Sequence, residues 1–131
     1  MDEDYISKTL KDILRLPNLA VEILVNLPIP LLIVDSNAMI IFSNREAEFL
    51  FGYHHTEFIG QHINILLPES VREVHKTHLE KFFSTPRPRA MGYGMELHAR
   101  LKNGSEIGIE IELRPIPTPD NLVVMASIRK K

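Results

Sequence analysis

The sequence predicts an α+β domain in which helices cover one face of an antiparallel sheet. Three observations support this prediction. Patterns typical of two helices, two strands, several short helices and three strands follow one another along the chain. Apolar and polar residues alternate through most of residues 95–113, as they do in half-buried strands. The length of 131 residues suits one domain, and a domain of this size buries roughly two thirds of its unfolded surface.

The composition excludes several classes of function. The formal net charge of -2 provides no basic field for nucleic-acid binding, because neutralising phosphates requires clustered Lys and Arg. Without cysteine the chain has no disulfide framework and no thiolate metal site, which is typical of a reducing compartment, so we expect a cytoplasmic protein. The longest mainly apolar stretch, residues 19–34, is interrupted by a glutamate, an asparagine and two prolines and therefore predicts no membrane span.

The first 27 residues predict two helices. In the first, apolar residues recur at helical spacing and acidic residues lie at the N-terminal end, where the helix dipole favours them. These apolar residues are Ile6, Leu10, Ile13 and Leu14. Pro17 ends this helix, and Asn18 is placed to cap a second one over Leu19–Leu27, which Pro28 and Pro30 stop.

A hairpin and a capped helix follow. Leu31–Val34 and Met39–Phe42 are rich in β-formers, and the residues between them suit a tight turn. Either Ser43 or Asn44 can cap the next helix, which Gly52 closes. Two short helical pieces are expected over residues 54–66, where His54 and His55 occupy a loop and are expected to be solvated.

A longer helix is predicted from Glu69 to Phe83, with Pro68 at its start. Its apolar stripe places two histidines among the residues that face the core. The stripe consists of Val71, Val74, His75, His78, Leu79 and Phe82. The next segment, STPRPRAMGYG, is rich in proline and glycine and predicts a flexible loop.

The last third of the chain predicts a long hairpin and a final strand over Asn121–Ile128, joined by a PIPTP loop. A three-residue turn, Asn103–Ser105, sets apolar residues opposite one another and pairs Leu101 with Ile107 and Ala99 with Ile109. The same register places His98 across from Glu110 on the polar face. We interpret that pair as a sheet contact and not as a catalytic acid and base.

Five pieces of the sequence, in this order and spacing, resemble a PAS domain, the sensor module common in bacterial signalling proteins. They are IVDSNAMIIFSN, NREAEFLFGY, FIGQHINILLPE, MGYGMELHARLKNGSEIGIEIEL and a last strand ending in SIRK. The similarity runs from about Pro28 to Arg129. It implies five antiparallel strands in the spatial order 2-1-5-4-3, with helices that enclose a small-molecule cavity against the sheet.

The resemblance also implies partners. In the family, such domains control outputs such as histidine kinases, and an N-terminal amphipathic helix commonly pairs with a second copy. We therefore interpret residues 1–27 as a helical cap that mediates homodimerisation and residues 28–131 as the PAS sensory domain.

The helix PESVREVHKTHLEKFF resembles that of the oxygen-sensing heme PAS domains of rhizobial kinases and bacterial phosphodiesterases. In those domains a histidine that follows PE and R ligates the iron, and His75 stands at that place. Where the rhizobial sensors have an arginine that contacts oxygen, this chain has Met95, and methionine ligates the iron in some hemes. The alternative interpretation of His75 is a core histidine that hydrogen-bonds a backbone carbonyl.

Other chemistry finds less support. His75 and His78 share a helix face and supply two potential zinc ligands, but the pattern offers no third, so no metal site is expected. The light-sensing flavin subclass needs a cysteine, which is absent, so only noncovalent flavin stays open. No nucleophile stands beside a base with a group to orient it, so the chain is not expected to be an enzyme.

We therefore expect a sensory input domain that binds a small molecule, mediates dimerisation, or both, and thereby controls an output domain. The expected cavity wall combines the two histidines with inward-facing apolar residues of the helix and sheet. These candidate residues are His75, His78, Leu79, Met95, Leu97, Ile109, Ile111 and Met125. No resident cofactor is predicted. The alternatives are a heme-based gas or redox sensor with His75 as axial ligand, and a ligand-free protein–protein interaction module.

Overall fold

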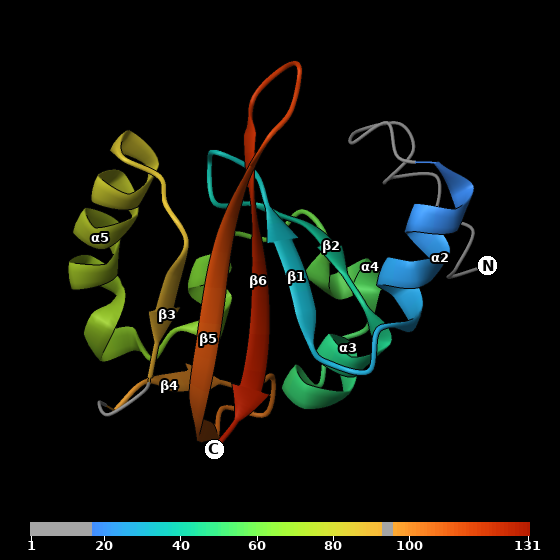
Figure 1. The fold of residues 1–131 in the computed structure, drawn as a ribbon. Coiled ribbons are helices and arrows are strands. Elements are labelled where there is room, and N and C mark those ends of the chain that lie inside the picture. Colours follow the sequence, from blue (N-terminus) through green and yellow to red (C-terminus); the bar gives the residue numbers. More distant parts are fainter. Residues whose placement is uncertain (1–16, 93–95) are drawn as a thin grey trace.

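A computed structural model describes residues 17–92 and 96–131. Its centre is an antiparallel sheet flanked by helices (Figure 1). The strands are β1 Leu31–Val34, β2 Ile40–Ser43, β3 Arg89–Met91, β4 His98–Arg100, β5 Glu106–Pro117 and β6 Leu122–Lys130. The helices are α2 Asn18–Asn26, α3 Arg45–Phe51, α4 His55–Phe58 and α5 Arg72–Ser84, with 3-10 turns η2 Ile63–Leu66 and η3 Glu69–Val71. The predicted first helix and Met95 lie outside the described residues.

The strands follow the order β2-β1-β6-β5-β3, and β4 also pairs with β5. The α+β class is confirmed, and the strand order differs slightly from the expected 2-1-5-4-3. The expected third strand is reduced to β4, and β3 lies in the segment that was expected to be a loop. Gly92 follows β3 with φ +90°, and a Cβ added there would meet the backbone oxygen of Ile109 at 2.4 Å. The close approach admits only glycine. Gly92 is therefore fixed against β5, and the flexible loop that was predicted for this segment is wrong here.

The register of the β4–β5 hairpin differs from the prediction by two residues. Ala99 lies opposite Ile107 and His98 opposite Gly108, so the predicted pairing of His98 with Glu110 is wrong. Lys102 leaves the ladder because its backbone N–H donates to the carbonyl oxygen of Phe51, at 2.9 Å. A shift of two residues keeps every side chain on its predicted face, whereas a shift of one would reverse the faces.

Glu110 instead lies opposite Arg129 in β6, and their side chains form an ion pair. The same strand pair continues through residues 115–117, which were expected to form a loop. Among the described strands, β5 beyond Leu113 pairs only with β6. Proline is tolerated there because its nitrogen, which has no hydrogen, faces the open edge.

The sheet has an apolar core on each face. The helices expected on one face lie together on it, and the N-terminal helix α2 covers the other face. On one face, α3, α4 and α5 lie over a core that includes Leu32 and Val34 of β1. On the other, Val21 and Val25 of α2 pack against Leu31 and Ile33 of the same strand. All four residues of β1 are buried, so the strand has no polar face and the sequence shows no alternation there.

Helix α2 begins at Asn18, and the residue in its N-cap position is Pro17.

Asn44 joins α3 to the sheet. Its buried side-chain oxygen accepts hydrogen bonds from the backbone N–H groups of Ala47 and Leu31, each at 3.0 Å. Its side-chain nitrogen donates to the carbonyl oxygen of Ile29 at 2.7 Å. Asn44 is therefore the N-cap of α3, one of the two caps that the sequence allowed, and Gly52 closes the helix in the left-handed conformation as predicted.

Replacing Asn44 with alanine removes this cap and leaves buried backbone groups without partners. We expect Asn44→Ala to lower the free energy of unfolding by about 2 to 4 kcal/mol, measured by urea denaturation. Asn26→Ala is the control, because Asn26 is exposed and bonds only within α2, to Glu22. The control should change stability by less than about 0.5 kcal/mol. Equal effects of the two substitutions would contradict the role assigned to Asn44.

Candidate functional site

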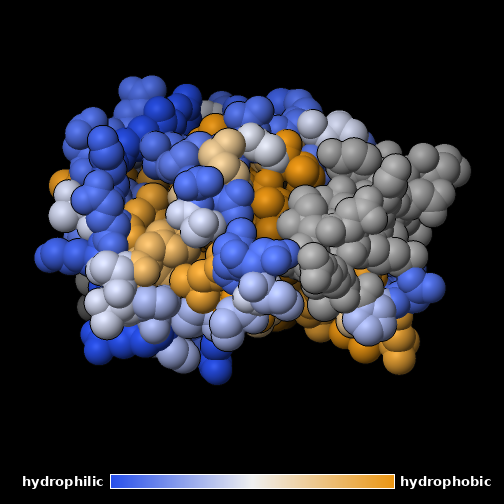
Figure 2. All heavy atoms as spheres, turned by 90° about the horizontal axis from the view of Figure 1, so that it is seen from above, coloured by the Kyte–Doolittle hydropathy of each residue, from blue (hydrophilic) through white to orange (hydrophobic). Residues whose placement is uncertain are grey.

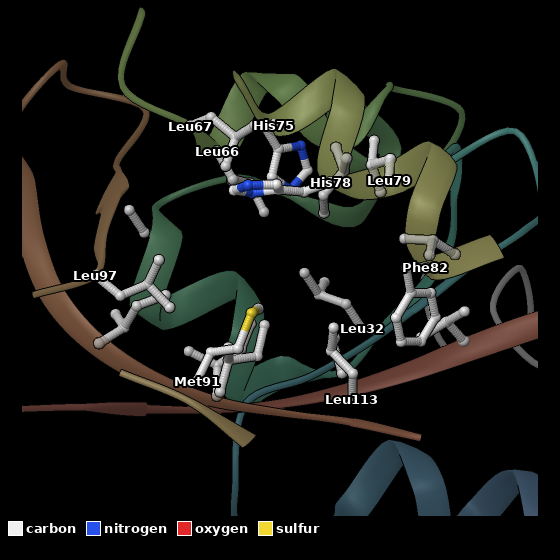
Figure 3. Close-up of a pocket in the computed structure, with 18 of the residues that line it drawn as sticks. Leu32, Leu66, Leu67, His75, His78, Leu79, Phe82, Met91, Leu97 and Leu113 are labelled. Atoms are coloured by element: carbon white, nitrogen blue, oxygen red, sulfur yellow. The ribbon is translucent and has the colours of Figure 1, made fainter. Parts of the chain in front are cut away.

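A cavity of about 190 Å³ lies between α5 and the sheet (Figure 3). Its lining is almost entirely apolar. The cavity lies on the face of the sheet that α3, α4 and α5 cover. From above, apolar side chains are visible between hydrophilic ones on the side of the molecule where α5 lies (Figure 2). The cavity is partly open to solvent.

The sheet forms the floor of the cavity through alternate residues of its strands. Ile111 of β5 lies opposite Ile128 of β6, and Leu113 lies opposite Ala126. Residues directly opposite one another in an antiparallel pair project to the same face, so both strands present apolar side chains to α5. The floor also includes Leu32, Val34, Ala99, Ile109 and Val124.

Helix α5 forms the roof. His75, His78, Leu79 and Phe82 are spaced by three or four residues and point from α5 toward the sheet (Figure 3). None of the 13 residues of α5 is buried, whereas α3 and α4 each bury two. The roof therefore covers the sheet without packing tightly against it.

Two residues of the predicted stripe face solvent instead. Val71 is 42% exposed and Val74 is 58% exposed. The turn that contains Val71 is a 3-10 helix, so α-helical spacing begins only at Arg72. Val74 consequently lies at the edge of the stripe and points away from the sheet.

Six of the eight predicted site residues line the cavity, namely His75, His78, Leu79, Leu97, Ile109 and Ile111. Met95 lies outside the described residues. Met125 packs on the other face of the sheet, in the core that includes α2. Residues 122–126 are apolar on both faces of β6, so their alternation does not reveal which residues point inward.

Arg89 and Met91 of β3 are lining residues that the sequence analysis missed. They pair with Leu113 and Ile111 and so face the cavity with them. The segment lies between prolines and glycines, and this composition predicts a loop. A strand of three residues is too short to show an alternating pattern.

The position of His75 in the cavity shifts the pKa of its imidazole. Its Nδ1 atom is buried and has no hydrogen-bond partner among the described residues. Burial lowers the pKa of the imidazole below its ordinary 6.5, and the nearby His78 and His62 lower the pKa further. His75 is therefore a neutral imidazole at neutral pH, with an unused ring nitrogen in an apolar surrounding.

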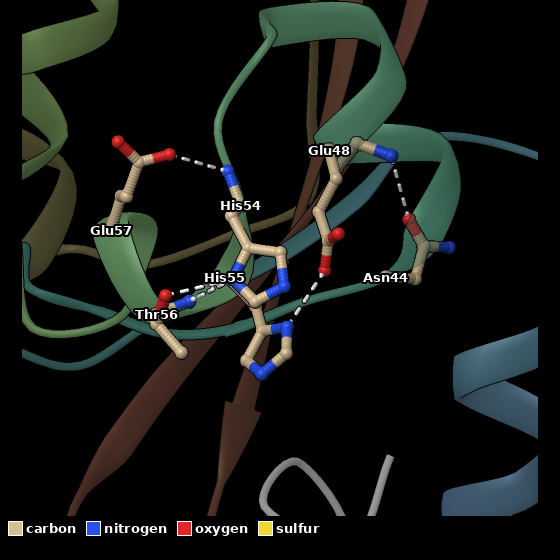
Figure 4. Close-up of polar contacts among 7 residues, drawn as sticks. Asn44, Glu48, His54, His55, Thr56 and Glu57 are labelled. Carbon is tan, nitrogen blue, oxygen red and sulfur yellow. Dashed lines mark hydrogen bonds and ion pairs between the residues drawn. The ribbon is translucent and has the colours of Figure 1, made fainter. Parts of the chain in front are cut away.

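A separate polar network joins α3 and α4 (Figure 4), and Lys102 of the β4–β5 turn bonds to it through Glu57. The ring of His55, which was expected to be solvated, is 1% exposed, and its Nδ1 lies 3.3 Å from Oε1 of Glu48. His54 and Glu57 form a capping box at the start of α4. Glu57 also bonds to Lys102, and this hydrogen bond is the largest cause of its lowered pKa. These contacts position the turn and present no nucleophile beside a base.

Within the described ranges, 17–92 and 96–131, no three His, Cys, Asp or Glu side chains form a group that could hold a metal ion. Within the same ranges, no helix has the length and apolar character that crossing a membrane requires.

Comparison with known proteins identifies the family. The sequence model of the family described as PAS fold matches residues 19–129. This chain belongs to the PAS family. The PAS domain of a protein from Colwellia psychrerythraea superposes with a TM-score of 0.73 at 19% identity, covering 86% of this chain and 94% of that one. The PAS domain of nitrogen regulation protein NR(II) from Vibrio parahaemolyticus gives a TM-score of 0.67 at 19% identity, covering 88% and 100%.

Two curated relatives contain a stretch similar to this PAS domain. Sensor protein FixL of Bradyrhizobium diazoefficiens is 29% identical over 91 residues, which make up 70% of this chain and 18% of the relative. Oxygen sensor protein DosP of Escherichia coli is 28% identical over 97 residues, which make up 74% of this chain and 12% of the relative. The chain therefore spans less than a fifth of either relative, and it is similar to a domain found in signalling proteins.

The lowered pKa of His75 predicts how stability depends on pH. Below about pH 6.5 the unfolded chain binds a proton at His75 more readily than the folded chain does. The free energy of unfolding should therefore decrease as the pH falls from about 6.5 toward the lower pKa of the folded state. His75→Gln should have a shallower decrease in urea denaturation over this range. Identical pH profiles for the two proteins would contradict the assignment.

Proposed function

We propose that this PAS domain is a sensory input domain that binds a small, mainly apolar molecule between α5 and the sheet. The observation that carries the proposal is an apolar cavity whose roof, α5, contains no buried residue. A ligand in this position gives the side chains of α5 apolar contacts that the sheet alone does not provide. Each 100 Å² of apolar surface removed from water contributes about 2.5 kcal/mol of stabilisation.

The size of the cavity limits the ligand. Its volume of about 190 Å³ is below the roughly 300–1,000 Å³ of pockets that hold drug-sized molecules. It exceeds the roughly 150 Å³ of an engineered apolar cavity that binds benzene. A ligand of one ring, or a short chain of similar volume, fits without rearrangement of the sheet.

Signal transmission follows from the connections of α5. The chain leads from α5 into β3, which pairs with β5, and β5 pairs with β6. A ligand that favours one position of α5 over another shifts the equilibrium between those positions by its difference in affinity. We propose that an output domain, such as a histidine kinase, responds to this shift. The proposal includes a cytoplasmic location, a non-catalytic role and pairing of the N-terminal helix with that of a second copy.

A substitution that fills the cavity tests ligand binding. Toluene should raise the melting temperature of the wild-type domain, because it binds the folded state. Ala126→Leu places a larger side chain on the cavity floor and should abolish this rise, with circular dichroism confirming the fold. Ala90→Leu adds the same volume at an exposed position outside the cavity and should keep the rise. Equal shifts in all three proteins would place the toluene site elsewhere, and no shift in the wild type would contradict the proposal.

A second candidate function is heme-based sensing with His75 as axial ligand, as the resemblance of the α5 sequence suggests. The observation that favours it is the neutral imidazole of His75, with a buried ring nitrogen on the cavity. The donor therefore fits heme, but the cavity does not. A porphyrin is several times larger than benzene, and about 190 Å³ does not hold it unless α5 moves outward.

Absorption spectroscopy distinguishes the candidates. If the domain binds heme through His75, added hemin should give a shifted Soret band in the wild type and in His78→Ala, but not in His75→Ala. His78 is the matched control because it lies one turn away on the same face of α5. Spectra that are identical for the wild type and His75→Ala would exclude heme ligation by His75.

A further inference from the structure

The charged and titratable side chains that face the cavity are all basic. His75 and His78 line the cavity from α5, and Arg89 lines it from β3. Arg89 lies opposite Leu113 of the cavity floor in the β3–β5 pair. None of the described lining residues is acidic. His98 also borders the cavity, but its ring lies beside Gly108, its partner across the β4–β5 pair. Ala99 follows His98 in β4, and Ile109 follows Gly108 in β5; both belong to the core beneath α5. Successive side chains of a strand point to opposite faces, so the ring of His98 points to the other face of the sheet.

Two carboxylates of elements that adjoin the cavity have partners of their own. Oε1 of Glu69, which precedes α5, lies 3.6 Å from Nη1 of Arg100. Oε2 of Glu112 in β5 lies 3.6 Å from Nη2 of Arg114. Arg89 has no ion-pair partner among the described residues. A guanidinium therefore stands at the exposed rim of the cavity, beside an apolar interior.

We propose that the ligand of this cavity is a small apolar monocarboxylic acid, whose carboxylate is bound by Arg89. This inference rests on the proposed function and specifies the chemical class of the ligand. The ring or chain lies on the apolar floor, and the carboxylate lies at the rim, where it keeps part of its hydration. The planar guanidinium matches a carboxylate with two parallel hydrogen bonds.

The surrounding groups select for this class. A cationic ligand would meet Arg89 and the two α5 histidines and would be repelled by any that are charged. A neutral ligand of the same shape would gain the apolar contacts alone. An anion gains the apolar contacts together with a charge-assisted hydrogen bond, which is roughly twice as strong as a neutral one.

The test compares acids with neutral molecules of the same shape. Calorimetric titration measures the affinity of the wild-type chain for benzoate and hexanoate and for the amides benzamide and hexanamide. The acids should bind at least about tenfold more tightly than the amides, because hydrogen bonds to charged groups are stronger than those between neutral groups. Arg89→Gln should remove most of this advantage and leave amide binding unchanged, while Arg89→Lys should keep part of it.

Arg87→Gln is the matched control, because Arg87 is exposed and does not line the cavity. It should leave the affinity for both acids unchanged. Equal affinities for acids and amides, or equal losses in Arg87→Gln and Arg89→Gln, would overturn the carboxylate proposal and leave the cavity as an apolar binding site. If acids, amides and toluene all fail to bind the wild type, the proposed function fails together with this inference.

Discussion

The separation between α5 and the sheet is the constraint on which the cavity depends. Helices α3 and α4 pack tightly, with Phe51 and Phe58 fully buried and their rings in edge-to-face contact at 5.9 Å. Helix α5 instead presents half-buried and exposed side chains to the sheet. The sheet fixes the other wall, because β5 and β6 pair over nine residues and β6 lies next to β1. Backbone pairing therefore ties the sheet wall on both sides, whereas the α5 wall contains no buried residue.

This asymmetry is the basis of the proposed sensing role. Elements with few buried apolar contacts open at low free-energy cost, and ligand-dependent movement draws on such elements. The fully buried Asn44 holds α3 to β1, and Gly92 holds the end of β3 against β5, so neither neighbour of the cavity moves easily. Membership of the PAS family agrees with this arrangement, but the cavity itself indicates which molecules fit. Its volume limits their size, and its basic rim favours a negative charge.

Much of the fold could be predicted from the sequence where the signal is local. The helix cap at Ser43 or Asn44, the closing Gly52 and the inward-facing Ile109, Ile111 and Leu113 of β5 depend on a few neighbouring residues. The structure confirms them, with Asn44 as the cap. Features that depend on distant contacts could not be predicted. The hairpin register is set by Lys102 bonding to Phe51, and the burial of His55 is set by its packing near Glu48. The face of the sheet on which Met125 lies could not be predicted, because residues 122–126 are apolar on both faces of β6.

The most direct test of a ligand between α5 and the sheet uses two methionine methyl groups. Met91 faces the cavity, whereas Met125 packs on the opposite face of the sheet with the core that includes α2. Carbon-13 labelling of the methionine methyls allows both to be followed by NMR during titration with toluene and benzoate. We expect a saturable shift of the Met91 resonance and little change at Met125. A shift confined to Met125, or equal shifts of both, would contradict binding in this cavity.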